Sequence, residues 1–469
     1  MLDAPIAPAK KQLEINRSIF RAYDIRGIVG EGLTKESVYA LGRAIGSQAL
    51  HCGEKRIVLG RDGRLSGPEL SRALSDGLLS TGCDVIDIGV VPTPLLYYAT
   101  YMMDTSSGVM LTGSHNPSNY NGLKIVMAGK TLAEEGIKNL YDRIVTRQLS
   151  DGRGEACDVD MVERYMSRIV QDVKLARPLK IVVDCGNGVA GHIAPDLFRR
   201  MGCDVHELFC DVDGSFPNHH PDPSQPENLE DLIRVVREQK ADIGLAFDGD
   251  GDRLGVVTTS GEIIWPDRQL MLFAKAVLHA NPGAKIIYDV KCTNHLAKVI
   301  HEFGGVPIMW KTGHSLIKSK LAETQAALAG EMSGHIFFKD RWYGFDDAIY
   351  AGARLLEIMS QAQGDSDALF SNIPNSVNTP ELKVYIDDDE KFLLMERLVK
   401  HADFHPAEIL TIDGLRVNFA DGWGLVRPSN TTPCLVLRFE ADSVAVLEKI
   451  KTIFREYLLA MKPDLVLTF

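Results

Sequence analysis

The sequence lacks the features typical of disulfide-rich, zinc-binding and membrane proteins. Its eight cysteines include no Cys-x-x-Cys pair and are scattered through apolar stretches, which makes a zinc site or a disulfide framework unexpected. No window holds 18 uninterrupted apolar residues, and residues 1–18 have no apolar segment typical of a signal peptide. We therefore expect a soluble cytoplasmic protein with reduced thiols and no membrane partner.

The sequence also has fewer basic than acidic residues. Lys and Arg number 51 against 63 Asp and Glu, and the formal net charge is -12. This balance disfavours nucleic acid as a partner, although a local basic pocket can still bind phosphate. The chain has 469 residues and is 45% hydrophobic, which exceeds what a single core usually holds. We expect two to four domains.

A strand–helix–strand unit recurs three times along the chain. Each copy starts with a β-like run, continues through a helical stretch that ends near glycine, and returns to a second apolar run. A third apolar run then leads into a polar loop that contains glycine. The first runs lie at 55–60, 180–184 and 285–289. In the first copy, Ser66 and Glu69 have the spacing of a capping box at the start of the helix.

Units of this kind form α/β domains, in which ligands bind at the carboxyl ends of the strands. The three polar loops should lie at those ends and face one cleft. From about residue 376 the pattern changes to shorter, charged segments and a final helix, which favours an α+β domain. We therefore predict three similar α/β domains with mixed sheets, followed by a smaller α+β C-terminal domain, around one central cleft. The expected boundaries are 1–156, 157–262, 263–375 and 376–469.

The first polar loop presents a candidate nucleophile. Gly113 permits backbone conformations that other residues avoid, and Pro117 cannot continue a helix, so Ser114 should stand at the tip of a turn with its hydroxyl exposed. His115 is adjacent to this serine, and Lys124 lies just beyond the loop. A serine in such a loop often only caps a helix or turn, so the segment by itself leaves both interpretations open.

The second polar loop has the composition of a site for a hard cation. Asp248, Asp250 and Asp252 alternate with glycine directly after an apolar strand, so three carboxylates can converge. Three carboxylates leave room for water and a phosphate oxygen, which suits octahedral Mg²⁺. An EF-hand would require glycine where this chain has Arg253, so that interpretation fails. The remaining alternative is a solvated acidic turn.

The third and fourth loops are suited to a sugar and a phosphate. Glu331, Ser333 and His335 are interleaved with glycine and combine donors with acceptors, as a polyhydroxylated ligand requires. In the C-terminal segment a guanidinium stands beside two hydroxyls and an amide, which is the donor set that a phosphate dianion needs. Its residues are Arg427, Ser429, Asn430 and Thr431. Taken alone, each segment can also be an ordinary turn.

One motif favours a different class of protein. Residues 186–191 fit Gly-x-Gly-x-x-Gly after a strand, and acidic residues follow near the distance expected for a ribose contact. An NAD-dependent oxidoreductase is therefore the alternative function. Against it, Glu207 falls within the next strand rather than at its carboxyl end, and no catalytic group accompanies the motif. A tight strand-to-helix turn explains the glycines more simply.

Together, the four loops in this order resemble the α-D-phosphohexomutase superfamily, over nearly the whole chain. The segments that carry the likeness are 112–117, 248–253, 330–335 and 427–431. The amino-acid sequences of these segments are similar to those of the phosphomannomutase/phosphoglucomutase branch. Met332 and Gly113 differ from the phosphoglucosamine mutase branch, which makes that second alternative less favoured. Pro428 stands where the family often has alanine, and the phosphate-binding residues around it are in place.

The resemblance implies an enzyme that interconverts hexose 1-phosphates and hexose 6-phosphates of mannose and glucose. Ser114 would carry a phosphate in the resting enzyme, and Mg²⁺ would be held by Ser114, Asp248, Asp250 and Asp252. The reaction would pass through a 1,6-bisphosphate that turns around in the cleft, with glucose 1,6-bisphosphate as an activator. The partners would be small phosphosugars, and the protein a monomer.

The resemblance also assigns roles to individual residues. Arg26, Arg253 and Lys124 would neutralise charge during phosphoryl transfer. His115, Lys124 and His335 are all candidates for the general acid and base, with Lys124 and His335 favoured. The expected substrate-binding residues are Tyr23, Lys291, His314, Glu331, Ser333, Arg427, Ser429, Asn430 and Thr431. Among these, Glu331 and Ser333 would hold the 3- and 4-hydroxyls of the sugar, and the last four would hold the phosphate that is not reacting.

Overall fold

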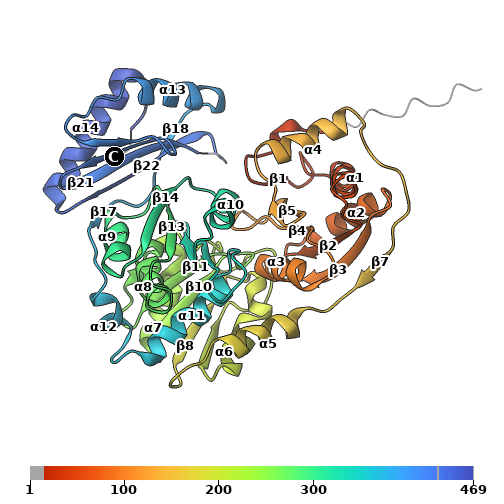
Figure 1. The fold of residues 1–469 in the computed structure, drawn as a ribbon, viewed down its shortest axis with the longest axis horizontal. Coiled ribbons are helices and arrows are strands. Elements are labelled where there is room, and N and C mark those ends of the chain that lie inside the picture. Colours follow the sequence, from red (N-terminus) through yellow and green to blue (C-terminus); the bar gives the residue numbers. More distant parts are fainter. Residues whose placement is uncertain (1–14, 430–431, 468) are drawn as a thin grey trace, which may run out of the picture.

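The described residues form four sheets, one in each of four successive domains (Figure 1). The computed structural model describes residues 15–429, 432–467 and 469. The first three sheets contain both parallel and antiparallel pairs, whereas every pair in the fourth is antiparallel. The predicted fold class is therefore confirmed.

The first sheet has the strand order β1-β5-β4-β2-β3-β7, and β6 pairs with β5. Its strands are β1 (Ile25–Ile28), β2 (Arg56–Arg61), β3 (Asp84–Val90), β4 (Gly108–Leu111), β5 (Tyr120–Met127), β6 (Lys130–Thr131) and β7 (Ala156–Asp158). The helices of this part are α1 (Lys35–His51), α2 (Gly67–Leu79), α3 (Thr93–Met102) and α4 (Glu135–Val145), with a 3-10 turn at Arg17–Ile19. Helices α1 and α2 lie side by side (Figure 1).

The capping box expected at the start of α2 is wrong. Ser66 precedes the helix, but its side chain makes no capping hydrogen bond. The reason is tertiary, because the Ser66 hydroxyl accepts a hydrogen bond of 2.9 Å from the Asn121 side chain on β5. Glu69 forms an ion pair with Lys35 of α1 instead of reaching back to the helix start.

The second and third sheets repeat one strand arrangement. Their orders are β12-β11-β10-β8-β9 and β14-β13-β15-β16. The second comprises β8 (Lys180–Asp184), β9 (Asp204–Leu208), β10 (Ile243–Phe247), β11 (Leu254–Thr258) and β12 (Ile263–Ile264), with helices α5 (Val162–Asp172), α6 (Ala194–Arg200) and α7 (Glu230–Gln239). The third comprises β13 (Lys285–Asp289), β14 (Val306–Trp310), β15 (Leu328–Gly330) and β16 (Ile336–Phe338), with helices α8 (Pro266–Ala280), α9 (Asn294–Glu302), α10 (His314–Thr324), α11 (Ala348–Gln361) and α12 (Ser366–Ser371).

The three predicted polar loops occupy equivalent places in these sheets. Each leaves the carboxyl end of a strand with a parallel neighbour and returns as the antiparallel strand beside it. The loops join β4 to β5, β10 to β11 and β15 to β16. The internal repeat thus places a nucleophile loop, an acidic loop and a glycine-rich loop at matching sheet edges.

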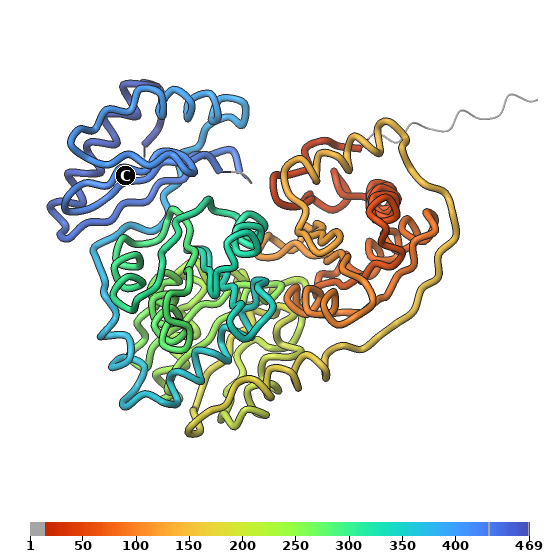
Figure 2. Tube along the Cα trace, in the orientation of Figure 1, coloured from red at the N-terminus to blue at the C-terminus, as the bar shows by residue number. Residues whose placement is uncertain are grey.

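The fourth sheet has the order β17-β22-β21-β20-β19, with β18 paired to β22. It comprises β17 (Val377–Asn378), β18 (Leu382–Tyr385), β19 (Glu408–Leu410), β20 (Leu415–Phe419), β21 (Gly422–Pro428) and β22 (Cys434–Ala441), with helices α13 (Asp388–Lys400) and α14 (Val444–Met461). The predicted phosphate loop begins at the end of β21. Figure 2 shows the chain passing into this domain along the outer edge of the third.

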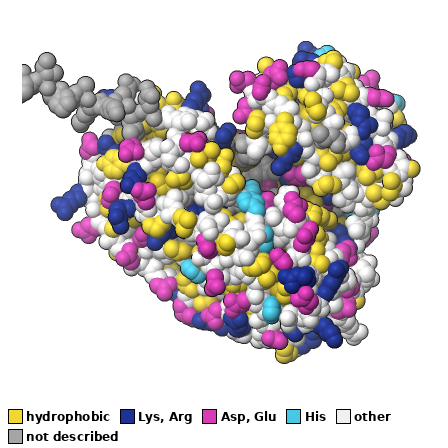
Figure 3. Space-filling model, turned by 180° about the vertical axis from the view of Figure 1, so that it is seen from behind, with side chains coloured by type: hydrophobic (Ala, Val, Ile, Leu, Met, Phe, Trp, Pro, Cys, Tyr) yellow, Lys and Arg dark blue, Asp and Glu magenta, His cyan; other side chains and the backbone are white. Residues whose placement is uncertain are grey.

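The hydrophobic cores follow the domains only in part. One core runs through the second and third domains and includes residues of α3 from the first. The first and fourth domains each have a core of their own. The surface is hollowed between the fourth domain and the rest of the molecule (Figure 3). Among the described residues, no helix is both long and apolar enough to span a membrane.

Candidate active site

Hydrogen bonds between the domains link all four of them around one site. Lys124 on β5 bonds to the acidic loop of the second domain. Arg253 of that loop contacts His335 of the third domain at 3.1 Å. The backbone N–H of Thr312 in the third domain donates to Asp413 of the fourth at 3.0 Å. Residues far apart in the sequence therefore share one centre, as the strand arrangement predicts.

Ser114 lies at the tip of the loop between β4 and β5, as predicted, but its side chain is almost fully buried rather than exposed. Its Oγ lies 3.1 Å from His115 Nδ1 and donates to Asp248 Oδ2 at 3.2 Å. The φ angle of Ser114 is 49°, a left-handed conformation uncommon outside glycine. Burial, together with the nearby cations Arg253 and Arg26, lowers the pKa of His115 well below its usual value, so this imidazole is neutral at pH 7.

The acidic loop brings three buried carboxylates together. Asp248, Asp250 and Asp252 each offer an oxygen within 4.8 Å of the others, and all three side chains are inaccessible to solvent. Burial and the charges of Asp250 and Asp252 raise the pKa of Asp248 well above its ordinary value. One oxygen each of Asp250 and Asp252 has no hydrogen-bond partner among the described residues. An oxygen-only donor set with open positions fits Mg²⁺.

Lys124 supplies the closest positive charge to this cluster. Its Nζ donates to Asp250 Oδ2 at 2.6 Å and also to Asp252. Burial alone would lower the pKa of Lys124, but the carboxylates of Asp250 and Asp252 outweigh it and raise the pKa overall. Because this amine keeps its proton at neutral pH, it is suited to stabilising negative charge.

The two predicted arginines flank the nucleophile. Arg26 donates to the Asn116 side chain in the nucleophile loop and forms an ion pair with Asp24. Arg253 Nε lies 3.9 Å from Asp248 Oδ2 and donates to His335 Nε2 at 3.1 Å. The three groups expected to neutralise charge thus all lie beside Ser114 or the acidic loop.

The glycine-rich loop holds Glu331 and His335 in buried positions. Glu331 accepts a hydrogen bond from the backbone N–H of Gly313, and burial raises its pKa. Ser333 lies on the same loop and is partly exposed. The Tyr23 hydroxyl donates to the Thr312 carbonyl at 3.0 Å, next to Gly313. The third domain therefore places acceptors, a hydroxyl and an imidazole along one side of the site.

The fourth domain contributes Arg427 at the end of β21. Its Nε donates to Asp413 at 3.0 Å, and its side chain is nearly buried. The Ser429 hydroxyl lies 2.8 Å from the Thr432 hydroxyl. Lys291 of the third domain donates to Glu381 at 2.5 Å across the domain boundary. Asn430 and Thr431, the other predicted phosphate-binding residues, lie outside the described residues.

Comparison with known proteins gives the same assignment along the whole chain. Descriptions of the phosphoglucomutase/phosphomannomutase alpha/beta/alpha domains I, II and III match residues 17–150, 163–261 and 265–376 in turn. The description of the C-terminal domain of the same proteins matches residues 381–456. The chain belongs to the phosphoglucomutase/phosphomannomutase family.

Relatives of this family are similar over their full length. A phosphomannomutase/phosphoglucomutase from Pseudomonas aeruginosa is 58% identical over 99% of both chains. A phosphoglucomutase from Neisseria gonorrhoeae is 55% identical over 94% of this chain and 96% of its own. The crystal structure of a phosphoglucomutase/phosphomannomutase family protein from Burkholderia thailandensis is 54% identical, covers 97% of this chain and 100% of its own, and has a TM-score of 0.93. The resemblance predicted from the four loops is confirmed.

Sequence reasoning missed two residues, the buried Asp346 and the partly buried Lys318, that lie near the predicted His335. Asp346 lies 3.1 Å from His335 Nδ1, and Lys318 donates to the same carboxylate at 2.8 Å. The ring of His314, which is among the predicted residues, stacks on the His335 ring with centroids 5.6 Å apart. Burial and Lys318 lower the pKa of His314 well below its usual value. None of these pairs has a sequence signal, because the partners are brought together only by the third domain's folding.

A second missed group lies under the nucleophile loop. Asp62 and Arg64 follow β2, and both side chains are almost fully buried. Asp62 and Arg64 belong to an Arg-Asp-Gly-Arg segment, which places three charged residues at the end of an apolar strand. That clustering is the signal that could have drawn attention to them, because charged side chains are seldom buried without a specific partner.

The alternative interpretation of residues 186–191 as a dinucleotide loop is wrong. A Cβ added to Gly188 would lie 3.0 Å from backbone atoms of Gly249, and one added to Gly191 would lie 1.9 Å from the Cys210 carbonyl. These glycines are therefore required because other backbone segments pack against them. The segment supports the acidic loop instead of opening toward a cofactor.

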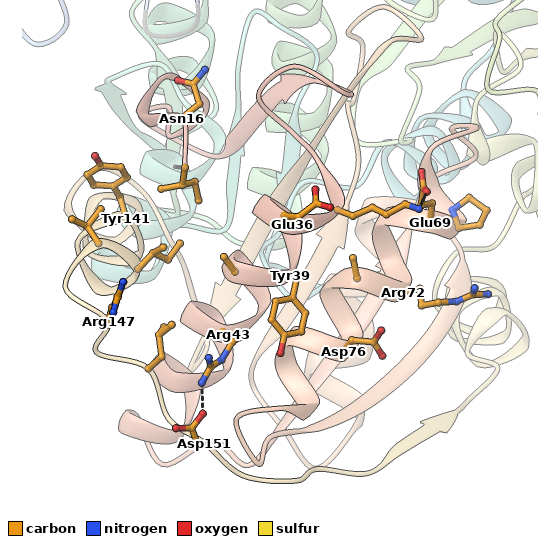
Figure 4. A pocket seen from close by; sticks show the side chains of 18 residues that line it. Asn16, Glu36, Tyr39, Arg43, Glu69, Arg72, Asp76, Tyr141, Arg147 and Asp151 are labelled. Carbon is orange, nitrogen blue, oxygen red and sulfur yellow. Dashed lines mark hydrogen bonds and ion pairs between the residues drawn. The ribbon is translucent and has the colours of Figure 1, made fainter. Parts of the chain in front are cut away.

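The cavity of about 1650 Å³ drawn in Figure 4 does not coincide with the site. It is lined by residues of α1, α2 and α4, among them Tyr39, Arg43, Arg72 and Tyr141. Lys35 and Glu69 pair on one wall, and Arg43 pairs with Asp151 on another. None of the four loops contributes to this cavity, so its size alone carries no functional assignment.

Proposed function

We propose that this enzyme is a phosphohexomutase that interconverts the 1-phosphates and 6-phosphates of glucose and mannose. The observation that carries the proposal is the position of Ser114 Oγ, 3.2 Å from Asp248 in a buried cluster of three carboxylates. Such a placement sets a nucleophilic hydroxyl beside a cation site, as phosphoryl transfer requires. Relatives with 58% identity that are named for both sugars support the dual specificity.

In the proposed cycle, Ser114 carries a phosphate in the resting enzyme. A free hydroxyl of the bound sugar phosphate attacks this phosphorus, the bond to Ser114 Oγ breaks, and a 1,6-bisphosphate forms. The bisphosphate then turns around, and Ser114 takes a phosphate back from the other end. Lys124, Arg26 and Arg253 neutralise the transferring group. Glucose 1,6-bisphosphate acts as an activator because it phosphorylates Ser114 when the serine is free.

Mg²⁺ is the cofactor that the site fits best, with Asp248, Asp250, Asp252 and a Ser114 phosphate oxygen as its ligands. The fit rests on oxygen donors alone and on one oxygen each of Asp250 and Asp252 that accepts no hydrogen bond from the described residues. A bound Mg²⁺ would supply positive charge where the transferring phosphoryl group develops negative charge.

The proton of the attacking hydroxyl is assigned to His335. Lys124 is held by two carboxylates that favour its charged form, which makes it a poor proton acceptor. His115 contacts Ser114 rather than the side of the cleft where the sugar would lie. His335 stands on the sugar loop, with Arg253 at one ring nitrogen and Asp346 at the other. We therefore place His115 beside the nucleophile and His335 beside the sugar hydroxyl.

The remaining predicted residues form the proposed sugar and phosphate contacts. Glu331 and Ser333 would hold the 3- and 4-hydroxyls in both orientations of the bisphosphate. Because such contacts do not touch C2, both glucose and mannose would be accepted. The non-reacting phosphate would be held by Arg427, Ser429, Asn430 and Thr431. Tyr23, Lys291 and His314 would support these contacts from the first and third domains.

Phosphorus NMR tests the proposed function. Glucose 1-phosphate and mannose 1-phosphate would be followed separately with Mg²⁺ and a trace of glucose 1,6-bisphosphate. We expect both to be converted to their 6-phosphates. Conversion of neither sugar would overturn the proposal, and glucosamine 1-phosphate would then be the next substrate to try.

The domain boundaries at 156, 262 and 375, the monomeric state and the cytoplasmic location are also proposed. The third boundary is supported by the start of β17 at Val377, whereas β7 (Ala156–Asp158) of the first sheet and β12 (Ile263–Ile264) of the second each extend two residues past the first two boundaries. Eight cysteines without a disulfide support a reducing compartment. Light scattering on the purified protein tests the monomer: a mass near 51.7 kDa is expected, and twice that mass would contradict it.

A further inference from the structure

Arg64 lies directly under the nucleophile loop and binds it from below. Its guanidinium donates to four backbone carbonyls of the loop between β4 and β5. One terminal nitrogen donates to the carbonyls of Ser114 at 2.8 Å and Asn116 at 2.6 Å. The other donates to those of Pro117 at 2.6 Å and Tyr120 at 2.9 Å. The whole loop is thus gathered around one buried side chain.

Asp62 completes the arrangement on the other side of the loop. Its Oδ2 accepts hydrogen bonds from Arg64 Nε at 3.2 Å, from the Thr112 hydroxyl at 2.7 Å and from the backbone N–H of Gly113 at 3.2 Å. The Thr112 hydroxyl in turn accepts from the backbone N–H of Ser114 at 2.8 Å. Asp62 and Arg64 therefore bind the peptide groups on both sides of the nucleophile, its N–H through Thr112 and its carbonyl directly.

The conformation of Ser114 explains why such a support is needed. Its φ of 49° is disfavoured for a residue with a side chain and persists only where the surroundings impose it. The guanidinium lies so close to Gly113 that an added Cβ would stand 2.4 Å from Arg64 Cζ. Glycine at 113 thus makes room for Arg64 as well as for the turn.

The same group joins the loop to the second domain. The Phe216 ring lies 5.2 Å from the Arg64 guanidinium. A Cβ added to Gly249, between two of the metal-binding aspartates, would lie 2.4 Å from the Ser114 carbonyl that Arg64 binds. A shift of Ser114 toward Gly249 would therefore collide with the acidic loop, so the position of each loop constrains that of the other.

We propose that Arg64, held by Asp62, is a positioning residue that aims Ser114 Oγ at the acidic loop for phosphoryl transfer. The inference rests on the proposed function, and it adds a residue that acts on Ser114 through the backbone carbonyl and is not among the predicted metal, sugar or phosphate contacts. Lysine cannot replace this group, because an ammonium has three donors on one atom, whereas here two separate guanidinium nitrogens serve four carbonyls. A role in stability alone is the alternative.

The test compares Arg64→Lys with Arg354→Lys. Arg354 is an equally well matched control, because it is also buried, carries a bidentate pair with Asp340 at 3.0 and 2.9 Å, and belongs to none of the four loops. For each variant, kcat and KM for glucose 1-phosphate and the thermal unfolding temperature are measured. Misplacing a reacting group by about 1 Å can cost about a hundredfold in rate.

We expect Arg64→Lys to lose at least about tenfold in kcat with KM changed less than about twofold, because the phosphate-binding residues are untouched. Arg354→Lys should lose stability and keep its kcat. Wild-type kcat in Arg64→Lys, or an equal loss of kcat in Arg354→Lys, would overturn the inference. If Arg64→Lys does not fold, Asp62→Asn serves in its place, because it keeps the side-chain shape while weakening three hydrogen bonds. Unchanged kcat in Asp62→Asn would equally overturn the inference. Wild-type protein without mutase activity would instead count against the proposed function.

Discussion

At the residue scale, the site consists of buried charged side chains that are paired with side chains of opposite charge. Lys124 faces Asp250 and Asp252, Arg253 faces Asp248, and Asp346 faces His335. Such pairs cost less to bury than isolated charges, and a phosphate or a cation that enters meets groups already oriented toward it. The arrangement explains why so many charged side chains are buried in one place.

The motif residues could be predicted because their chemistry is visible in short segments. Ser114 and its neighbours, the three aspartates, and the residues of the sugar loop form three separate segments, and each segment is only a few positions long. Their supports could not be predicted in the same way. Arg64 reaches a loop about fifty positions away, and the partners of Arg427 and Lys291 belong to other segments of the fold. Those contacts depend on tertiary packing, which periodicity does not encode.

Arg427 offers a test at this scale. Replacing it by methionine removes a guanidinium from the proposed phosphate-binding loop while keeping much of the side-chain volume. We expect KM for both glucose 1-phosphate and mannose 1-phosphate to rise at least about tenfold, because a charge-assisted pair with phosphate is lost. Steady-state kinetics measure this change, with exposed Arg234→Met as the control. An unchanged KM for both sugars would remove Arg427 from phosphate binding.

At the element scale, the repeat of strand, helix and strand was predictable, whereas the antiparallel return strands were not. Runs of apolar residues indicated β2, β8 and β13 and their neighbours. The order of strands within a sheet is decided by tertiary pairing, so β5, β11 and β16 were not anticipated as the partners of the loop-bearing strands. The error at Ser66 has the same origin, since a hydrogen bond from β5 replaced a local cap.

The acidic loop between β10 and β11 predicts a strict requirement for a divalent cation. Removing metal with EDTA should abolish turnover, because the three buried carboxylates would then depend on neighbouring side chains such as Lys124 and Arg253 to offset their charge. Adding Mg²⁺ back should restore it in the wild type, and Asp250→Asn should need a higher Mg²⁺ concentration. Activity that survives exhaustive chelation would show that this loop is not catalytic.

Asp347, at the start of helix α11, should make the stability of the protein depend on pH. Burial raises the pKa of Asp347 to about 7, even though Tyr165, Trp342 and the backbone of Tyr350 donate hydrogen bonds to it. The unfolded-state pKa is about 3.9, so the contribution of Asp347 is full below that pH and is lost as pH rises through the folded-state pKa.

We therefore expect the unfolding temperature of the wild type, relative to that of Asp347→Asn, to fall between about pH 4 and about pH 7. The asparagine side chain keeps an acceptor for the helix start but does not titrate in this range. Differential scanning calorimetry of both proteins measures the difference. A constant offset across the range would mean that Asp347 is already ionised in the folded protein.

At the scale of the whole molecule, the fourth domain is suited to closing over the cleft. It has its own hydrophobic core, and contacts to the third domain include a small cluster of Val290, Trp423 and Leu425. Because its Arg427 would hold the distal phosphate, binding of a bisphosphate should draw this domain toward the other three. Closure would also keep water away from the reacting phosphate.

Small-angle X-ray scattering tests this motion. We expect the radius of gyration of Ser114→Ala to decrease when glucose 1,6-bisphosphate is added, since that variant binds the intermediate without consuming it. Inorganic phosphate at the same concentration serves as the control, because it is too small to bridge the nucleophile loop and the fourth domain. A radius that does not change with the bisphosphate would argue for a cleft that is already closed.

The central claim is that Ser114 carries the transferred phosphate, and mass spectrometry of the enzyme tests it most directly. After incubation with Mg²⁺ and glucose 1,6-bisphosphate, peptide mapping should place one phosphate on Ser114, and turnover of glucose 1-phosphate should exchange this phosphate with phosphate from the sugar. Ser114→Ala should carry no phosphate and lose at least about a thousandfold in turnover. An enzyme that turns over with Ser114 never phosphorylated, or that carries its phosphate on another residue, would contradict the account.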